Sequence, residues 1–442
     1  MSELVYRELL ERVGEQAPRP RLEPSARLVD LLGSPQRSAP VVHVTGTNGK
    51  TSTSRMIEAL LRSSGLRTGL LTSPHLERFA ERIIIDGEPI DDEALERNWL
   101  DIRPFVEMVD AELGAAGEAP LTFFETLTAL AFACFADAPV DVMVIEVGMG
   151  GEWDSTNVAD GDVAVFTPVD LDHLGRIGDS LEEIATTKAG IIKPGALVVS
   201  ASQAASVESI LRERASERGA QIRFAGEAFA LDSTTPAVGG QLVSIRGLAG
   251  RYAELFVPMY GAHQGQNAAL ALAAVEAFVG GGTVELDSEV VTSALAEVTS
   301  PGRLEIIGVA PTVILDGAHN PHGARALVRA IEESFQFDEL AVVVGVLAEK
   351  DADGLVAALA PLGQLWFATQ SRSDRALPAE DVGRLAVRHG RTATVEPDAD
   401  AAIRAARDWA GQAAGRGVLV TGSLTLVGHA RAFARSEGWL HA

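Results

Sequence analysis

Residues 41–60 read VVHVTGTNGKTSTSRMIEAL, an apolar run that passes through a glycine-bearing turn into a helical pattern. The run 41–45 predicts a buried parallel strand, and residues 51–64 predict a helix closed by Gly65. A strand, a GTNGKT turn and a helix are the context of a phosphate-binding loop, in which backbone N–H groups and a helix N-terminus face the anion. The alternative is an ordinary strand-to-helix turn. The residues expected to bind nucleotide phosphates are Gly46, Thr47, Asn48, Gly49, Lys50, Thr51 and Ser52.

Lysine is scarce in this chain, and its positions are therefore informative. The 37 basic residues comprise four lysines and 33 arginines. A lysine fits a compact phosphate site as a point charge, and its amine can lose a proton and react, which arginine does poorly. Lys50 and Lys188 lie inside motifs, so we expect both to be catalytic, whereas Lys193 in the turn IIKPG is equally compatible with chance.

Composition excludes several classes of protein. The 442 residues carry a formal net charge of -24 and no basic run, and an acidic surface repels phosphodiester backbones, so no nucleic-acid partner is expected. No apolar run reaches the roughly 18–20 residues that span a bilayer. Residues 1–14 predict an amphipathic helix and not a signal peptide. The single cysteine, Cys134, lies in an apolar stretch and is expected to be a buried side chain in a cytoplasmic protein.

Strand and helix patterns alternate along most of the chain and predict an α/β fold with a doubly wound, mostly parallel sheet. Short β-like runs within 225–260 predict a small antiparallel patch, and a second alternation from Thr312 predicts a smaller Rossmann-like α/β domain. We place the boundary near 300–310, which gives domains 1–300 and 301–442. Further strands are expected at 67–71, 140–147, 162–169 and 197–200, and helices at 123–135, 181–189, 204–218 and 264–279.

A second candidate site follows the strand 140–147 in the run IEVGMGGEWDSTN. Glu146 stands at the carboxyl end of that strand, where doubly wound sheets bind ligands, and a carboxylate there is a candidate ligand for Mg²⁺. The glycines that follow allow the backbone to pass close to a ligand. The alternative is a surface glutamate in a flexible loop.

His173 and Lys188 form a third candidate site, after the strand 162–169. His173 is a candidate metal ligand, although a lone histidine is more often a polar residue with ordinary partners. A lysine beside a cation should be repelled by it. Lys188 fits such a site if its amine is neutral and has captured CO₂ as a carbamate, which would be an anionic oxygen ligand.

Polar side chains at two further places are candidate nucleotide contacts. His263, Gln264 and Asn267 precede a long apolar helix, where they either cap the helix or contact the nucleotide base. Arg303 stands near the expected domain boundary, where it could reach the nucleotide. Asp316 and His319 follow a strand in the run DGAHNP, which taken alone is a turn.

The motifs RLVDLLGSPQRSAPVVHVTGTNGKTS, TSPHLERFAERIIIDGEPI, VIEVGMGGEWDSTN, GAHQGQNAALAL, SPGRLE and LDGAHNPHGA together resemble the folylpolyglutamate synthase and dihydrofolate synthase family of the Mur ligase superfamily. The resemblance covers nearly the whole chain. It implies an ATP-dependent amide ligase that adds L-glutamate to dihydropteroate, or to the glutamate tail of reduced folates, through an acyl phosphate. It also implies a P-loop ATP-binding domain over 1–300, a glutamate-ligase domain over 301–442, two Mg²⁺ ions, a carbamylated Lys188 and a monomer.

The resemblance further implies roles for individual residues. Ser73, Glu146, His173 and Lys188 are the implied metal ligands. Asn267, Arg303 and Asp316 are implied to contact the nucleotide, and Lys50, Lys188, His173 and His319 are the implied catalytic residues. The residues implied to border the acceptor substrate are Ser73, Pro74, His75, Arg82, Phe124, Glu125 and Asp154.

Two other functions are compatible with parts of the sequence. A ligase for cell-wall precursors is favoured slightly by Thr51 in GKTS, but the runs SPHL and DGAHNP oppose it. A regulatory nucleotide-binding protein would keep the phosphate loop, but it gives no reason for His173, Lys188 and a second α/β domain. Glu152 stands where a basic residue is common in the family, beside a site for anionic substrates, and bears on substrate choice.

Overall fold

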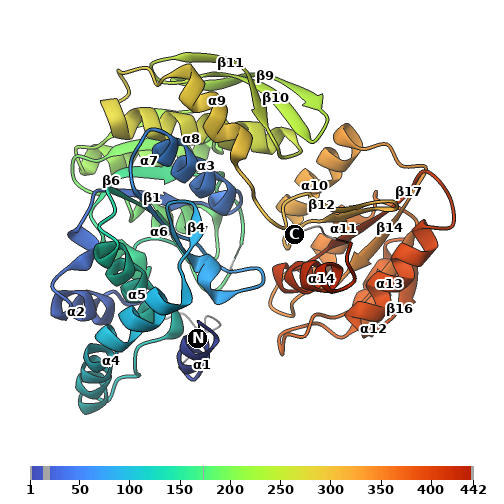
Figure 1. The fold of residues 1–442 in the computed structure, drawn as a ribbon, viewed down its shortest axis with the longest axis horizontal. Coiled ribbons are helices and arrows are strands. Elements are labelled where there is room, and N and C mark those ends of the chain that lie inside the picture. The colour runs from blue at the N-terminus through green and yellow to red at the C-terminus, as the bar shows by residue number, and fades with distance from the viewer. Residues whose placement is uncertain (1, 13–19, 173, 440–442) are drawn as a thin grey trace. The chain divides into compact units, whose positions relative to one another are not determined.

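The computed structural model describes residues 2–12, 20–172 and 174–439 (Figure 1). The chain forms two compact units. The first comprises residues 1–234, 242–257 and 265–298, and the second comprises 235–241, 258–264 and 299–442.

The first unit is built on an eight-stranded sheet of described residues, in the order β4-β3-β2-β5-β1-β6-β7-β8. The strands from β2 to β8 in that order run parallel, and β3 and β4 form an antiparallel edge beside β2. Every residue of β1 is buried, as expected of a central parallel strand covered on both faces. The predicted doubly wound, mostly parallel sheet is confirmed. The strands are β1 Val41–Thr45, β2 Thr68–Leu71, β3 Ile83–Ile85, β4 Glu88–Pro89, β5 Val142–Glu146, β6 Gly161–Phe166, β7 Leu197–Ser200 and β8 Gln221–Phe224.

Helices cover both faces of this sheet, with α3 on one side and α4 and α5 on the other (Figure 1). The long helix α4 is absent from the elements expected from the sequence. The α-helices are α1 Ser2–Leu10, α2 Glu23–Leu31, α3 Lys50–Ser63, α4 Asp92–Ala115, α5 Phe123–Asp137, α6 Leu181–Ala189, α7 Ala205–Glu217, α8 Ala262–Gly280 and α9 Ser288–Glu297, and the 3-10 turns are η1 Pro35–Arg37, η2 Phe79–Arg82 and η3 Ser155–Val158.

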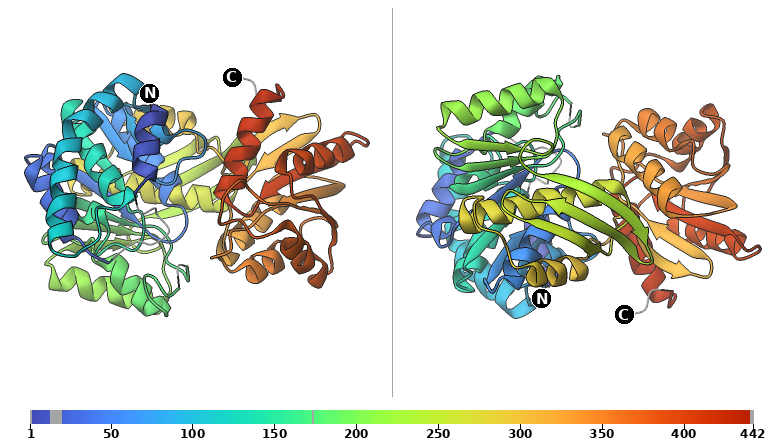
Figure 2. Two further views of the ribbon diagram at one scale, coloured as in Figure 1. Left: turned by 90° about the horizontal axis from the view of Figure 1, so that it is seen from below. Right: turned by 90° about the horizontal axis from the view of Figure 1, so that it is seen from above.

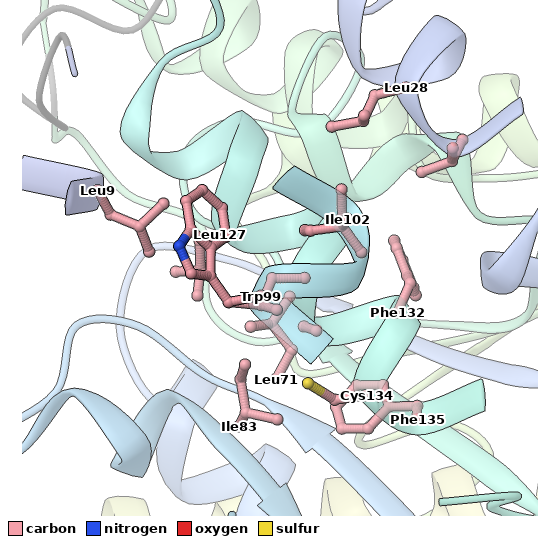
Figure 3. Packing of buried hydrophobic residues seen from close by; sticks show 14 of the residues in the cluster. Leu9, Leu28, Leu71, Ile83, Trp99, Ile102, Leu127, Phe132, Cys134 and Phe135 are labelled. Atoms are coloured by element: carbon pink, nitrogen blue, oxygen red, sulfur yellow. The ribbon is translucent and has the colours of Figure 1, made fainter. Parts of the chain in front are cut away.

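A hydrophobic cluster joins the N-terminal helices to α4, α5 and the sheet (Figure 3). Leu9 of α1, Trp99 of α4 and Leu127 of α5 contribute to it, together with Leu71 of β2. Cys134 lies in the same cluster, 1% exposed and without a disulfide, which confirms its predicted burial. This cluster fixes the start of α5, and with it the position of Phe124.

An antiparallel sheet in the order β11-β10-β9 supplies the predicted small β patch, and Figure 2 shows its strands in yellow-green. The strands are β9 Ala230–Ala237, β10 Gly240–Arg246 and β11 Arg251–Val257. The turn between β10 and β11 is held by Glu276 of α8, which is fully buried. Its carboxylate accepts hydrogen bonds from Leu248 N, from Ala249 N at 3.2 Å, from Gly250 N at 3.0 Å and from the Tyr252 hydroxyl at 2.9 Å.

We expect Glu276→Ala to lower the free energy of unfolding by about 3 kcal/mol or more, because buried donors left without an acceptor each cost about 1–3 kcal/mol. Urea denaturation followed by circular dichroism measures the loss. Glu297→Ala removes an exposed carboxylate from the end of α9 and is the matched control, with an expected change within about 0.5 kcal/mol. Equal losses in the two variants would refute the role given to Glu276.

The second unit contains a six-stranded sheet of described residues, in the order β12-β13-β17-β14-β15-β16. Only β12 runs antiparallel to its neighbour, and the other described pairs are parallel, so the predicted Rossmann-like α/β sheet is present. The strands are β12 Glu305–Val309, β13 Thr312–Leu315, β14 Glu339–Val344, β15 Leu365–Ala368, β16 Thr392–Val395 and β17 Arg416–Thr421, and the helices are α10 Pro321–Ser334, α11 Ala352–Leu359, α12 Ala379–Arg388, α13 Ala399–Ala410 and α14 Leu424–Ser436.

None of the helices in the described part of the chain combines the length and apolar character needed to span a bilayer.

Candidate active site

Four segments of the first unit meet at one edge of its sheet. They follow the carboxyl ends of β1, β2, β5 and β6, and the strand order places β1 between β5 and β6, with β2 beside β5. The carboxyl edge of a doubly wound sheet is where ligands bind, because the loops there leave a crevice. Of the sequence-predicted residues, Glu146 ends β5, Ser73 lies on the segment after β2, and Lys50 directly follows the segment after β1.

The turn after β1 has a backbone that only glycine tolerates at two positions. Gly46 has φ of +146°, and a Cβ placed on it would lie 1.8 Å from Thr167 Oγ1. Gly49 has φ of +87°, and a Cβ there would lie 2.8 Å from Asn267 Oδ1. The turn therefore packs directly against the segment after β6 and against Asn267 of α8, which places Asn267 at the predicted phosphate loop.

Lys50 begins α3 and folds back over this turn. Its Nζ donates hydrogen bonds to the carbonyl oxygens of Gly46 at 3.2 Å and Thr47 at 3.3 Å. Thr51 and Ser52 follow in the first turn of the helix, where the backbone N–H groups have no carbonyl partner within the helix. A helix start, a glycine turn and an ammonium group together form a site with the chemistry to hold a phosphate.

Glu146 ends β5 and is 1% exposed. Its carboxylate accepts hydrogen bonds from Thr51 Oγ1 at 2.9 Å, from Thr72 Oγ1 at 2.5 Å and from Ser73 N at 3.4 Å. Burial raises the pKa of this carboxyl, against the opposing charge of Lys50 and the three hydrogen bonds. A buried carboxylate beside hydroxyl groups presents hard oxygen ligands, which is the donor set that Mg²⁺ takes together with substrate phosphates. These residues therefore fit the implied cation.

Lys188 of α6 reaches the same turn from the other side. It is 4% exposed, and its Nζ donates a hydrogen bond to the Gly46 carbonyl oxygen at 2.7 Å. Burial, followed by the charge of Lys50, lowers the pKa of Lys188 to about 7, although Asp172 and Asp154 act in the opposite direction. A substantial fraction of the amine is thus neutral near pH 7, as a nucleophilic amine requires.

The segment after β5 passes close to two helices. A Cβ on Gly148 would lie 2.4 Å from the Phe124 ring, and a Cβ on Gly151 would lie 2.8 Å from the Lys188 carbonyl oxygen. Asp154 is buried, and its carboxylate accepts from Met149 N at 2.8 Å and Thr156 N at 3.0 Å. Burial raises the pKa of Asp154, against these hydrogen bonds. The glycines thus bring Phe124, Lys188 and Asp154 together around one loop.

His75 and Arg82, two of the residues predicted to border the acceptor, are joined by a hydrogen bond. Arg82 Nε donates to His75 Nδ1 at 2.8 Å, and the guanidinium lies 5.1 Å from the centre of the Phe123 ring. Burial, followed by the charge of Arg82, lowers the pKa of His75 to about 3, so the ring is neutral. Tyr6 packs its ring against His75 at 5.2 Å. The sequence did not predict Tyr6, because nothing local connects α1 to this loop, whereas Phe123 lies in the segment 122–125 expected to border the acceptor.

Three other predicted acceptor residues have distinct surroundings. Both oxygens of the Glu125 carboxylate are engaged: they accept from Thr122 N at 2.6 Å in the capping box of α5, and from Arg21 at 2.9 and 3.0 Å. Ser73 is half-buried and Pro74 is exposed. Glu125 thus stabilises the first turn of α5, the turn that also carries Phe124.

The second unit brings Arg303, Asp316 and His319 together after β13. Asp316 is 8% exposed and accepts from Leu304 N at 3.0 Å and Ala318 N at 2.9 Å. Burial raises the pKa of Asp316, against the charge of Arg303 and these hydrogen bonds. His319 Nδ1 lies 2.9 Å from the Gly317 carbonyl oxygen, and a Cβ on Gly317 would lie 2.7 Å from Arg303 Nη1.

His173 lies outside the described residues, so its predicted role as a metal ligand stays a prediction. Within the part of the chain that the structure covers, no three His, Cys, Asp or Glu side chains gather as a metal-binding group. Glu152, noted for its acidic charge, is exposed, and its backbone N–H donates to the Thr187 carbonyl oxygen at 2.8 Å.

Comparisons with known proteins agree over almost the whole chain. Residues 44–275 match the model of the Mur ligase middle domain, and residues 302–424 match that of the Mur ligase glutamate ligase domain. The chain is 44% identical over 445 residues to a dihydrofolate synthase/folylpolyglutamate synthase of Mycobacterium tuberculosis, covering 94% of this chain and 91% of that protein.

Two solved structures are similar throughout. A Mycobacterium tuberculosis folylpolyglutamate synthase complexed with ADP has a TM-score of 0.93 and 41% identity, over 98% of each chain. E. coli FolC in complex with DHPP and ADP has a TM-score of 0.86 and 29% identity, also over 98% of each chain.

Proposed function

The chain belongs to the folylpolyglutamate synthase and dihydrofolate synthase branch of the Mur ligase family, and from this membership we propose how its residues carry out the reaction. It is an ATP-dependent ligase that adds glutamate to folates. We propose that the acceptor carboxyl belongs to dihydropteroate, to the glutamate tail of a reduced folate, or to both. We also propose residues 1–300 as the ATP-binding domain and 301–442 as the glutamate-ligase domain.

One observation carries this proposal: Lys50 and Lys188 both donate to the Gly46 carbonyl oxygen, and Lys50 acts electrostatically on the buried Glu146 carboxylate. A turn that only held β1 to α3 would need neither two amines on one carbonyl oxygen, one of them buried, nor a buried acid. We propose that the transferred phosphoryl group and the acceptor carboxylate meet at these charges.

The chemical problem is that a carboxylate is a poor electrophile, because its negative charge repels an attacking amine. Transfer of the γ-phosphoryl group of ATP to the carboxylate gives an acyl phosphate, in which phosphate is the leaving group. Lys50 and the N–H groups at the start of α3 offset the charge on the phosphoryl group as it moves, and catalysis of this step is mainly positioning and electrostatics. The amine of L-glutamate then forms the amide bond and phosphate leaves.

Glu146, Thr51 and Ser73 have the chemistry to hold Mg²⁺. When bound, Mg²⁺ supplies positive charge that neutralises phosphate oxygens. We propose that Lys188 is carbamylated: its buried amine, with a pKa of about 7, can lose its proton to react with CO₂ and become an anionic oxygen ligand. With His173 it would complete a site for a second ion.

The other predicted residues take supporting roles in the proposal. Asn267 lies against the phosphate loop, and Arg303, Asp316 and His319 of the second unit contact the nucleotide. His75, Arg82, Phe124 and Asp154 border the acceptor, and Ser73 and Pro74 form the chain beside it. Glu125 holds the first turn of α5 and thereby positions Phe124. We further propose that the protein works as a monomer in the cytoplasm, where its single buried thiol needs no partner.

An assay of ADP release tests the proposal. The protein is incubated with ATP and Mg²⁺, with and without L-glutamate, and offered dihydropteroate, tetrahydrofolate or a UDP-muramoyl peptide in turn. We expect ADP release that requires both L-glutamate and a pteridine acceptor. ADP release that does not depend on L-glutamate, or that requires the UDP-muramoyl peptide, would contradict the proposed function.

A further inference from the structure

Helix α10 of the second unit carries a row of basic side chains. His322, Arg325 and Arg329 are spaced three and four residues apart, so they share one side of the helix. Arg325 and Arg329 are exposed, and His322 is half-buried.

The two arginines of this row are not neutralised by acidic side chains. Glu332 and Glu333 follow Arg329 at three and four residues, but neither forms an ion pair with it, and the described residues give Arg325 and Arg329 no hydrogen bond or ion pair. Helical side chains lean toward the helix N-terminus. This tendency favours a position of the Arg329 guanidinium away from the two glutamates and toward the turn that carries Arg325.

The imidazole ring of His263 lies beside this helix. A Cβ on Gly261 would lie 2.6 Å from His263 Cε1 and 2.8 Å from the Cβ of Ala330, so the His263 ring packs against α10. Burial, followed by the charges of Arg303, Arg329 and His322, lowers the pKa of His263 to about 4. The charge of Arg329 thus acts on a neutral imidazole that packs beside its helix.

Arg325 and Arg329, two cations one helical turn apart, repel each other, and an anion relieves the repulsion. The nearby carboxylate of Asp316 accepts from Leu304 N and Ala318 N and is buried, so it serves the turn after β13. Resting on the proposed function, we propose that Arg325 and Arg329, on the side of α10 beside His263, bind α-carboxylates of the glutamate tail carried by the folate acceptor.

Carboxylates of a tail suit this surface better than the other anions of the reaction. The triphosphate already has the loop at Lys50. The planar guanidinium matches a carboxylate with two parallel hydrogen bonds. Arg325 and Arg329 are separated by about 6 Å along the helix axis, at 1.5 Å per residue, and are open to water. An open row fits a flexible chain with repeated carboxylates, whereas a single amino acid held for reaction needs an enclosed site.

The double variant Arg325→Gln/Arg329→Gln tests this assignment with acceptors that bear one, two or three glutamates. We expect the KM for the triglutamate acceptor to rise about five- to tenfold, a size typical of two exposed charge contacts, and the KM for the monoglutamate to stay within about twofold. The kcat and the KM values for ATP and L-glutamate should not change. At 0.5 M NaCl the difference between acceptors should shrink, because exposed charges are screened.

Arg384→Gln removes an exposed arginine from α12 and is the matched control, expected to leave all KM values unchanged. Arg329→Lys keeps the charge and loses the planar fork, so it should give an intermediate effect. A rise that is equal for all acceptors, a rise confined to ATP or L-glutamate, or no rise at all would overturn the inference. Absence of ligation by the unaltered protein would instead overturn the proposed function, and the two failures are therefore distinguishable.

Discussion

Glu146→Gln is expected to reduce kcat/KM for ATP-dependent ligation by at least about 10³-fold, a loss typical of removing one electrostatic element from a phosphoryl-transfer site. The amide keeps the shape of the side chain but removes its charge and turns one acceptor into a donor. Thr51 and Thr72 both donate to this carboxylate; the amide oxygen still accepts from one hydroxyl, and the other hydroxyl can accept from the amide N–H. Steady-state rates of ADP release measure the loss.

The same substitution should not lower stability. Burial raises the pKa of Glu146 in the folded protein. Above the ordinary pKa of a glutamate carboxyl, the buried charge therefore lowers the free energy of unfolding, and this loss increases with pH until the pH passes the raised pKa. Removing the charge should raise the midpoint of thermal unfolding at pH 7.5. Glu276→Gln is the control, since that carboxylate accepts from several backbone donors and its loss should lower the midpoint. A less stable Glu146→Gln protein would contradict the electrostatic argument.

Lys188→Arg is expected to abolish measurable turnover, a fall of about 10³-fold or more, while the fold is retained. Arginine stays protonated, so it supplies no neutral amine and forms no carbamate. In the unaltered protein the rate should fall as the pH drops below about 7, because the Lys188 amine then becomes protonated. Near-normal activity of the arginine variant would refute the carbamate proposal.

Two further variants separate chemistry from packing. Lys193→Arg changes a half-buried lysine that donates to the Asn157 carbonyl oxygen at 2.8 Å, and it should retain most of the activity. Lys188→Ala opens space beside Gly46, and millimolar formate should restore part of the rate if the side chain acts as a carboxylate. Circular dichroism confirms that each variant is folded.

Much of the fold follows from local patterns. The parallel strands β1, β5 and β6 are buried on both faces, so they stand in the sequence as continuous apolar runs. Helix α4 was not predicted because charged residues interrupt it and Pro104 lies inside it. A signal was present, since its buried positions recur at intervals of three and four residues: Leu95, Trp99, Ile102, Val106, Val109 and Leu113.

In the candidate site, too, the residues of one continuous stretch could be predicted, whereas contacts between distant parts of the sequence could not. The phosphate loop is one continuous stretch, and the residue types and spacing of 46–52 were sufficient to predict it. The partners of Glu146 are Thr51 and Thr72, which are distant in sequence and meet only through the strand order. Likewise Arg21 is separated from Glu125 by about a hundred residues, so no local pattern connects them.

The shared acceptor at Gly46 has a consequence for the order of events. Its carbonyl oxygen receives both ammonium groups, and the positive charge of Lys50 is one reason why Lys188 gives up its proton readily. A bound triphosphate neutralises that charge and weakens this influence. Lys188 should therefore lose its proton more readily before ATP binds, and its carbamylation should precede nucleotide binding. Pre-incubation with bicarbonate should then shorten any lag in the first turnovers.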